Sequence, residues 1–482
     1  YPMSDGEQNE ILPSLKKNVT RASLSTKIID FAVKLTIVSI IAAGIFIGSK
    51  QVYNMYDQQY PIFSEHNSRA LTISAVIVFV LASAALYYYF SRKPTVYLVG
   101  FSTAVPPDEL KMSNKRFSDY VDENNKCFNE KSLEFLHKLI MRTGLGDETY
   151  VPPAYNTAPP DNSYRAAREE FEIVIRLACD DLFKRLEIDP TKDIDFIVTN
   201  CSLFAPTPSM SAMIMNIYKV KQSCRNFSLG GMGCSAGLVS IDLARDLLRC
   251  NRNCNVLVFS TESITRGWYR GQEKGKLLDN TLFRMGGAAI LLSNKPKYAG
   301  KAPYKLFTTV RINHQKYDDA YNAIFQSEDK EEEGVVGVKI GRELFKCVTR
   351  ALVQNLNQLM PQVMSWKDVF RFLIDMVEKK LGKKKKEEVF APNFRETFQG
   401  FCIHAGGRAI IDGLQDNLKL TDEDCMPSRA ALYRFGNTSS SSVWYEFKFI
   451  ERIQTLRKGD KVWQVAFGSG LKCNSVVWVK IN

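Results

Sequence analysis

The sequence predicts an α/β protein preceded by a hairpin of two transmembrane helices. Two long apolar stretches lie near the N-terminus, at residues 31–48 and 70–90. After residue 94, short β-rich runs alternate with stretches of helical periodicity, which is typical of α/β proteins. The 482 residues are 45% hydrophobic and 24% charged, so the chain can hold a membrane segment plus one or two globular domains with sizeable cores.

Both apolar stretches have about the length that a bilayer core requires. The stretch 31–48 carries one charge, Lys34, near its start. The stretch 70–90 carries no charge and ends in three tyrosines at 87–89, as an interfacial aromatic belt would. A buried core helix or a cleaved signal peptide is the competing interpretation, and the presence of a second span argues against a cleaved signal.

Basic residues beside the hairpin predict its orientation. Four lie in the tail 1–27, two follow the second stretch, and the loop between the stretches carries only Lys50 and Arg69. Positive residues favour the cytosolic side of a membrane. We therefore expect the tail 1–27 and the body after the hairpin 28–93 to face the cytosol.

The body contains two groups of buried-strand patterns. The first group comprises Ile194–Thr199, Val256–Ser260 and Ala288–Leu292, and the second comprises Phe401–Ile403, Val462–Phe467 and Val476–Val479. Each group is compatible with one sheet flanked by helices. Between them, the acidic stretch 326–334 is predicted to be a surface loop. The lysines at 383–386 are predicted to be a solvated charged segment, with a lipid-facing role as the alternative.

Charge and cysteine content limit the partners and the cellular compartment that are compatible with the sequence. A formal charge of +12 suits nucleic acid, an anionic membrane surface or a phosphate-bearing substrate. No zinc-finger spacing, RNA-binding signature or arginine-rich arm is present, so we expect no nucleic-acid partner. The 11 cysteines, an odd number without framework spacing, favour reduced thiols in a cytosolic setting. No metal site is expected, and only four histidines are available for chemistry.

Cys234 is the candidate nucleophile. It lies between a β-like run and a helical stretch, among glycines 230, 231, 233 and 237. A helix N-terminus favours a thiolate over a thiol, and small neighbours leave room for a ligand. A buried structural cysteine in a glycine-rich turn is the competing interpretation on local pattern alone.

Six motifs, in one order, resemble those of the plant-type 3-ketoacyl-CoA synthases. They are Gly144–Tyr150 (GLGDETY), Gly230–Gly237 (GGMGCSAG), Arg284–Asn294 (RMGGAAILLSN), Phe401–Ile410 (FCIHAGGRAI), Arg434–Tyr445 (RFGNTSSSSVWY) and Phe467–Asn474 (FGSGLKCN). The resemblance covers the chain from Pro94 to the C-terminus, and the upstream hairpin is also typical of that family. It implies a thiolase-type fold of two similar α/β halves, here 94–300 and 301–482, which is usually dimeric.

The resemblance also implies a catalytic set of Cys234, His404 and Asn437. His404 follows a strand-like run and precedes two glycines, and Asn437 precedes a run that is compatible with the start of a helix near Ser441. On pattern alone, each residue has an equally good structural interpretation. His404 would be a satisfied core histidine, and Asn437 would be a helix-capping asparagine. Cys402 is predicted to be a packed core cysteine rather than a second catalytic thiol.

The implied reaction is a decarboxylative Claisen condensation of malonyl-CoA with a long-chain acyl-CoA through an acyl-cysteine intermediate. His404 and Asn437 would hold the enolate oxygen, and the backbone N–H groups of Cys234 and of the loop with Gly468 and Gly470 would hold the tetrahedral intermediate. His314 matches a family histidine with a one-residue shift and is either functional or structural. Two further family histidines are absent, since Gly400 and Tyr433 occupy their positions, and Thr103 occupies a position that is often cysteine.

The same resemblance implies a multi-pass protein of the endoplasmic reticulum membrane with a cytosolic catalytic domain. It implies no cofactor beyond the acyl-CoA and malonyl-CoA substrates, and partnership with the reductases and dehydratase that complete elongation. Two other functions stay open from the sequence: a polyketide-type enzyme that extends its substrate repeatedly, and a catalytically silent elongase scaffold.

Overall fold

The computed structural model describes residues 74, 76–83, 93–330, 332–364, 371, 374 and 394–482. The chain divides into two units, and Thr95–Asn482 belongs to one of them. The first predicted membrane helix, 31–48, lies outside the described residues, and of the second only Ser74 and residues 76–83 are described, as helix. No helix within these described ranges is both long enough and apolar enough to cross a bilayer.

Nine strands of the body form one sheet in the order β11-β12-β13-β8-β1-β7-β6-β4-β5. Their bounds are β1 (Tyr97–Thr103), β4 (Phe196–Asn200), β5 (Arg225–Leu229), β6 (Asn255–Thr261), β7 (Gly287–Ser293), β8 (Tyr304–Asn313), β11 (Gly400–Ile403), β12 (Lys461–Gly468) and β13 (Lys472–Lys480). All six strands that the sequence predicts are among them.

Two strand pairs lie outside this sheet: β2 (Lys111–Met112) with β3 (Thr149–Tyr150), and β9 (Ile324–Glu328) with β10 (Val336–Ile340). The β9–β10 hairpin corrects the prediction of a surface loop at 326–334, since residues 326–328 pair with 336–338. Both strands are largely exposed and border acidic residues, which is why the sequence did not indicate them.

The two halves of the sheet repeat one arrangement. In the first half, β7 runs antiparallel to both β1 and β6, and β6 runs parallel to β4. In the second half, β13 runs antiparallel to both β8 and β12, and β12 runs parallel to β11. A short antiparallel contact between β1 and β8 joins the halves. This duplication is the expected thiolase-type arrangement of two α/β halves.

Helices cover and separate the two half-sheets. The helices are α3 (Asn114–Glu123), α4 (Glu130–Ile140), α5 (Tyr164–Leu186), α6 (Pro190–Asp193), α7 (Met210–Tyr218), α8 (Ala236–Cys250), α9 (Lys274–Leu282), α10 (Asp318–Tyr321), α11 (Leu344–Val363), α13 (Phe394–Thr397), α14 (Arg408–Leu418), α15 (Asp422–Phe435) and α16 (Ser442–Ile453). The short 3-10 helices are η1 (Asp108–Leu110), η2 (Pro153–Asn156), η3 (Gly233–Ser235), η4 (Pro296–Tyr298) and η5 (Ser439–Ser441).

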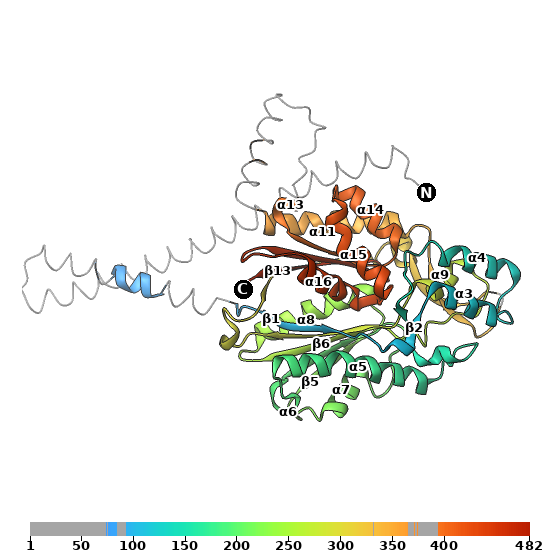
Figure 1. The fold of residues 1–482 in the computed structure, drawn as a ribbon. Helices are drawn as coiled ribbons and strands as arrows, with labels where there is room; N and C mark the ends of the chain where they lie inside the picture. Colours follow the sequence, from blue (N-terminus) through green and yellow to red (C-terminus); the bar gives the residue numbers. More distant parts are fainter. Residues whose placement is uncertain are drawn as a thin grey trace, which may run out of the picture. The chain divides into compact units, whose positions relative to one another are not determined.

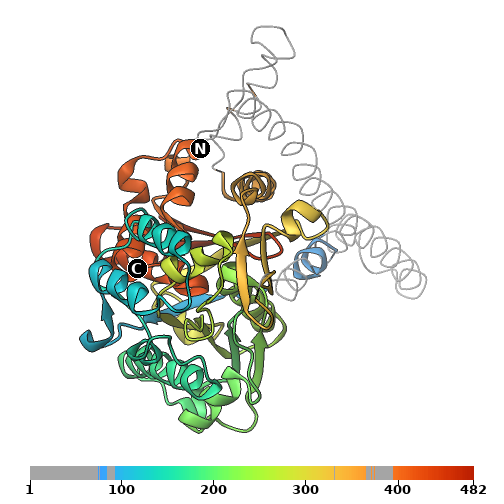
Figure 2. The same ribbon diagram turned by 90° about the vertical axis from the view of Figure 1, so that its right-hand side faces the viewer.

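The body is layered, with α5 outside the first half-sheet, α11 outside the second, and α8 and α16 between them (Figure 1). One face of α8 is buried: Ile241, Ala244 and Leu248 join a core cluster with residues of α16 and of both half-sheets. α3 and α4 pack together at one end, on the side that faces the viewer in Figure 2. The central helices therefore bring segments from distant parts of the chain together at their N-terminal ends.

Candidate active site

Cys234 lies in η3, the turn that leads into the central helix α8. Gly233 has φ +66°, and a Cβ there would lie 2.4 Å from the backbone nitrogen of Ser469, so this position requires glycine. The N–H of Gly233 donates to Ser202 Oγ at 2.8 Å. The turn is therefore held from two sides, with Cys234 at the N-terminal end of α8 as predicted.

A second turn, η5, meets Cys234 from the other half of the chain. A Cβ on Gly237 would lie 2.2 Å from the carbonyl oxygen of Ser440, so a glycine in α8 allows η3 and η5 to touch. Ser439 Oγ lies 3.5 Å from Cys234 Sγ and 3.1 Å from Glu262 Oε2. Glu262 Oε1 in turn accepts backbone N–H bonds from residues 202 and 203, at 2.9 and 2.7 Å. The thiol is thus linked through one hydroxyl to a fixed carboxylate.

The thiol of Cys234 has a raised pKa of about 12. Burial is the main cause; the hydrogen bond from Ser439 lowers the pKa, and the charges of Glu262 and Asp279 raise it. The sequence led us to expect the opposite direction from the helix N-terminus, but burial outweighs that effect here. Because such a thiol is protonated at neutral pH, its proton must be removed during the reaction.

Residues of α16 hold the His404 ring and the backbone next to it in place. Ser442 Oγ lies 2.6 Å from Nδ1. The next residue, Ala405, donates its N–H to Glu446 Oε1 at 3.0 Å, and Ser428 Oγ donates to Glu446 Oε2 at 3.1 Å. Burial lowers the pKa of His404 to about 4, so the imidazole is neutral at pH 7. When the Ser442 hydroxyl donates to Nδ1, the neutral ring carries its hydrogen on Nε2, which then acts as a donor.

Asn437 is held by both halves of the chain. Its N–H donates to the Leu282 carbonyl at 3.1 Å, and its own carbonyl accepts from the N–H of Arg284 at 3.0 Å. The side-chain Oδ1 accepts from the N–H of Ser439 at 2.8 Å, and Nδ2 donates to the Gly406 carbonyl at 3.3 Å. Since the oxygen faces a backbone donor, Nδ2 is oriented as the donor group, with a second hydrogen left for a ligand.

The structure brings Cys234, His404 and Asn437 to one cavity of about 430 Å³, a size typical of small-molecule sites. Polar lining comes from Ser202, Glu262, Asp279, Gln315, Gln326, Ser439, Ser469 and Lys472. Apolar lining comes from Leu203, Phe283, Tyr321, Ile324, Phe325, Val338, Ile340, Leu344, Val348, Ile410 and Phe467, many of them on the β9–β10 hairpin and α11. A polar reaction centre therefore adjoins an apolar wall.

The other predicted residues lie in different settings. Gly470 lines the cavity, whereas Gly468 packs against η3, where a Cβ would lie 2.4 Å from Ser235 Oγ. His314 is buried away from the cavity lining, with Nε2 2.8 Å from Gln354 Oε1, which favours its structural alternative. Cys402 is fully buried in the central core, as predicted.

Several residues at the site were missed from the sequence. Ser439 and Ser442 belong to the serine run after Asn437, which signalled a helix start but not two contacts to catalytic candidates. Glu262 follows strand β6, and only its place at the end of a strand hinted at a site. No sequence pattern marked Asp279. It is only 4% exposed, and in the described structure neither of its carboxylate oxygens has a hydrogen-bond partner.

Comparisons with known proteins agree with this architecture. A family model described as "FAE1/Type III polyketide synthase-like protein" matches residues 88–381, and one for the C-terminal domain of chalcone and stilbene synthases matches residues 332–482. The fold is similar to that of the type III polyketide synthase domain of Steely1 from Dictyostelium, with a TM-score of 0.62 and 17% identity over 80% of this chain and 100% of that chain. A type III pentaketide synthase from Neurospora crassa gives a TM-score of 0.61 and 16% identity, over 80% of this chain and 99% of that chain.

Together, the fold and the family models define the chain as a thiolase-type condensing enzyme. Sequence relatives specify the family further. The chain is 46% identical to 3-ketoacyl-CoA synthase 9 from Arabidopsis thaliana, over 84% of this chain and 80% of that protein. It is 44% identical to 3-ketoacyl-CoA synthase 17 from the same plant, over 85% of this chain and 84% of that protein. The chain belongs to the 3-ketoacyl-CoA synthase family.

Proposed function

We propose that this protein condenses malonyl-CoA with a long-chain acyl-CoA to give 3-ketoacyl-CoA, free CoA and carbon dioxide. Family membership supports the reaction class. The observation that carries the residue assignment is that Cys234, His404 and Asn437, from distant parts of the chain, line one cavity. The apolar wall of that cavity suits an acyl chain.

Cys234 is the nucleophile in the first stage. Its sulfur attacks the acyl-CoA thioester carbonyl, the bond from that carbonyl to the CoA sulfur breaks, and the thiol proton leaves on CoA. The N–H groups of Cys234 and of the turn with Gly470 are proposed donors to the tetrahedral oxyanion. The product of this stage is an acyl-cysteine thioester.

His404 and Asn437 act in the second stage. Malonyl-CoA loses carbon dioxide, and the electron pair of the broken carbon–carbon bond becomes an enolate whose charge lies on the thioester oxygen. Nε2–H of His404 and Nδ2–H of Asn437 donate to that oxygen. The enolate carbon attacks the acyl-cysteine carbonyl, the bond from that carbonyl to Cys234 Sγ breaks, and 3-ketoacyl-CoA departs. The Cys234 thiolate then takes a proton from solvent. No atom is oxidised or reduced by a partner, so the two CoA thioesters and one proton from solvent suffice as reactants.

We also propose membrane anchoring through the predicted hairpin 28–93, in the endoplasmic reticulum, with the catalytic body in the cytosol. The reductases and dehydratase of elongation are the proposed partners, because a 3-ketoacyl product needs reduction, dehydration and a second reduction. A homodimer is supported by β5, an edge strand with residues 225–228 exposed, since an open edge is a template for strand pairing.

The test is expression of the full chain in microsomes with a panel of long-chain acyl-CoA substrates and labelled malonyl-CoA. We expect a product two carbons longer, and none from Cys234→Ala. Products with several extensions would favour the polyketide alternative, and unchanged elongation by Cys234→Ala would favour a scaffold role.

A further inference from the structure

One buried cation in the cavity has no part in the proposed steps. Lys472, at the start of β13, is 4% exposed and lines the cavity. Its ammonium donates to the Ser469 carbonyl at 2.6 Å, which is the one hydrogen-bond acceptor that the described residues supply. An ammonium carries three N–H donors, so two are left for a ligand.

Lys472 lies beside Ser469 and Gly470, whose turn packs against η3, the turn that carries Cys234. Its Nζ would be 3.6 Å from a Cβ on Gly470, and Gly470 lines the cavity. Ser469, which accepts the hydrogen bond from Lys472, approaches Gly233 so closely that a Cβ there would lie 2.4 Å from its nitrogen. The ammonium is thus anchored to a turn that packs directly against the turn that carries Cys234.

The charges of the cavity are divided between the two halves of the chain. The acidic lining residues, Glu262 and Asp279, belong to the first half, and Lys472 belongs to the second. Within the described lining, Lys472 is the one lysine or arginine. Burial lowers its pKa to about 8, so it is protonated at neutral pH. A ligand carboxylate is therefore repelled by Glu262 and attracted to Lys472.

We propose that Lys472 binds the free carboxylate of malonyl-CoA; this inference rests on the proposed function. Near the reacting carbons, this carboxylate is the one anionic group that the two substrates carry. The ammonium holds it while His404 and Asn437 hold the thioester oxygen, so the malonyl group is fixed at both ends. When carbon dioxide leaves, the charge moves to the oxygen, and Lys472 keeps its bond to Ser469. Lys472 would therefore distinguish malonyl-CoA from acetyl-CoA.

Binding to a variant that cannot form acyl-cysteine tests this selectivity. The full chain carrying Cys234→Ala, in detergent, is titrated with malonyl-CoA and with acetyl-CoA by calorimetry, with and without Lys472→Met. Methionine is unbranched, is one atom shorter than lysine, and removes the charge. We expect malonyl-CoA to bind roughly 10- to 100-fold more weakly after the substitution, as for loss of one charge-assisted hydrogen bond. Acetyl-CoA binding should change by less than about twofold, and Lys472→Arg should retain most of the preference for malonyl-CoA.

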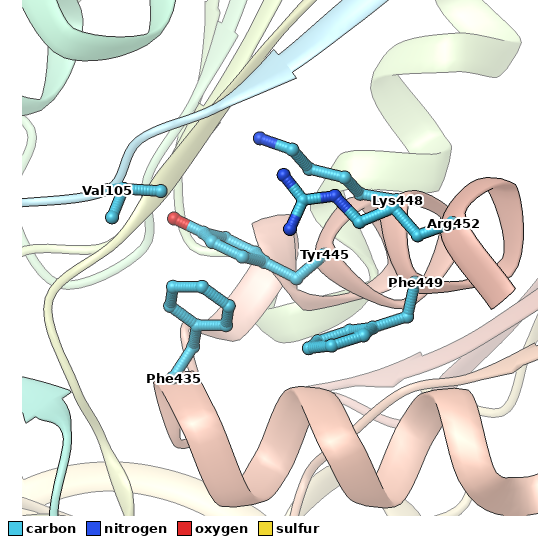
Figure 3. Close-up of a pocket in the computed structure, with 6 residues that line it drawn as sticks. All are labelled: Val105, Phe435, Tyr445, Lys448, Phe449 and Arg452. Atoms are coloured by element: carbon cyan, nitrogen blue, oxygen red, sulfur yellow. The ribbon is translucent and has the colours of Figure 1, made fainter.

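Lys448 provides the matched control. It is a partly buried lysine with one hydrogen bond, from Nζ to Thr103 Oγ1 at 3.0 Å. It lies in a separate small pocket with Arg452, Phe449 and Tyr445 (Figure 3). Lys448→Met should leave both affinities unchanged.

Two results would overturn the inference: an unchanged malonyl-CoA affinity in Lys472→Met, or an equal loss of affinity for malonyl-CoA and acetyl-CoA. Neither depends on product formation. Failure of the proposed function would instead appear as a parent chain, with Cys234 intact, that forms no acyl-cysteine and no 3-ketoacyl-CoA. Mass measurement of the parent after incubation with acyl-CoA separates the two failures.

Discussion

Ser439 Oγ contacts Cys234 Sγ at 3.5 Å, although 205 positions separate the two residues in the chain. The same hydroxyl lies 3.1 Å from Glu262 Oε2, so it bridges the thiol and a buried carboxylate. Ser439 also has φ +55°, a left-handed conformation that is uncommon for a residue other than glycine. Strained backbone of this kind is concentrated at functional sites.

Ser439→Ala should make Cys234 less reactive. The hydrogen bond from Ser439 lowers the pKa of the thiol, so its loss raises that pKa and reduces the thiolate fraction at any pH. Iodoacetamide labelling of Cys234 at pH 8 should slow by about two- to tenfold, the worth of one ordinary hydrogen bond. Ser441→Ala is the control, because Ser441 Oγ donates to the Thr438 carbonyl instead. Equal labelling rates in both variants would show that the Ser439 hydroxyl does not affect the reactivity of the Cys234 thiol.

Glu262→Gln should have the opposite effect on the same thiol. The negative charge of Glu262 raises the pKa of Cys234, and glutamine removes that charge while its oxygen can still accept the N–H bonds of residues 202 and 203. The pH midpoint of Cys234 labelling should therefore move to lower pH. A midpoint that stays in place or rises would show that Glu262 promotes deprotonation instead.

Most of the fold could be predicted from the sequence, because six strands of the main sheet are buried apolar runs. β4, β6, β7, β11, β12 and β13 were all visible in this way. β8 was missed because its side chains alternate between buried and exposed among basic and polar residues. The β9–β10 hairpin was missed for a similar reason: both strands are largely exposed and border an acidic turn.

The site was predictable only where a motif marked it. Cys234, His404 and Asn437 were found through the family resemblance, and the structure brings them to one cavity. The direction of the Cys234 pKa shift was not predictable, because burial depends on how η3 and η5 pack against each other across the fold. Asp279 lies on a helix outside the six motifs. Lys472 lies within the motif Phe467–Asn474, but the motif alone gave this lysine no role. The charges of both residues acquire meaning only from the shared cavity.

His404 should make the stability of the protein depend on pH. Its pKa is about 4 in the fold, against 6.5 for an unperturbed histidine, because burial disfavours the charged ring. Between these values the unfolded chain takes up a proton that the folded chain does not, so stability falls as the pH is lowered from 6.5 to 4. The loss amounts to about 3 kcal/mol.

In His404→Gln this contribution is absent. The difference in free energy of unfolding between the parent and the variant should shift by about 3 kcal/mol in favour of the variant as the pH is lowered from 7 to 4. Urea unfolding of the full chain in detergent measures it, with His137→Gln, near the surface, as the control. A constant difference across this range would mean that His404 is charged or solvated in the fold.

Gly237→Ala should separate the two halves of the site. A Cβ at this position would lie 2.2 Å from the Ser440 carbonyl oxygen. The Cβ is fixed on helix α8 and the oxygen belongs to the backbone of η5, so η5 must move away from α8 and η3. Overpacking of this kind costs about 1–3 kcal/mol in the free energy of unfolding. Movement of η5 also draws Ser439 and Asn437 away from Cys234, so elongation should fall by a larger factor than stability alone explains. Gly230→Ala is the matched control, since a Cβ there meets no atom closer than 3.9 Å. If both variants elongate acyl chains equally well, contact between the two turns is not what aligns the thiol with the donors of the second half.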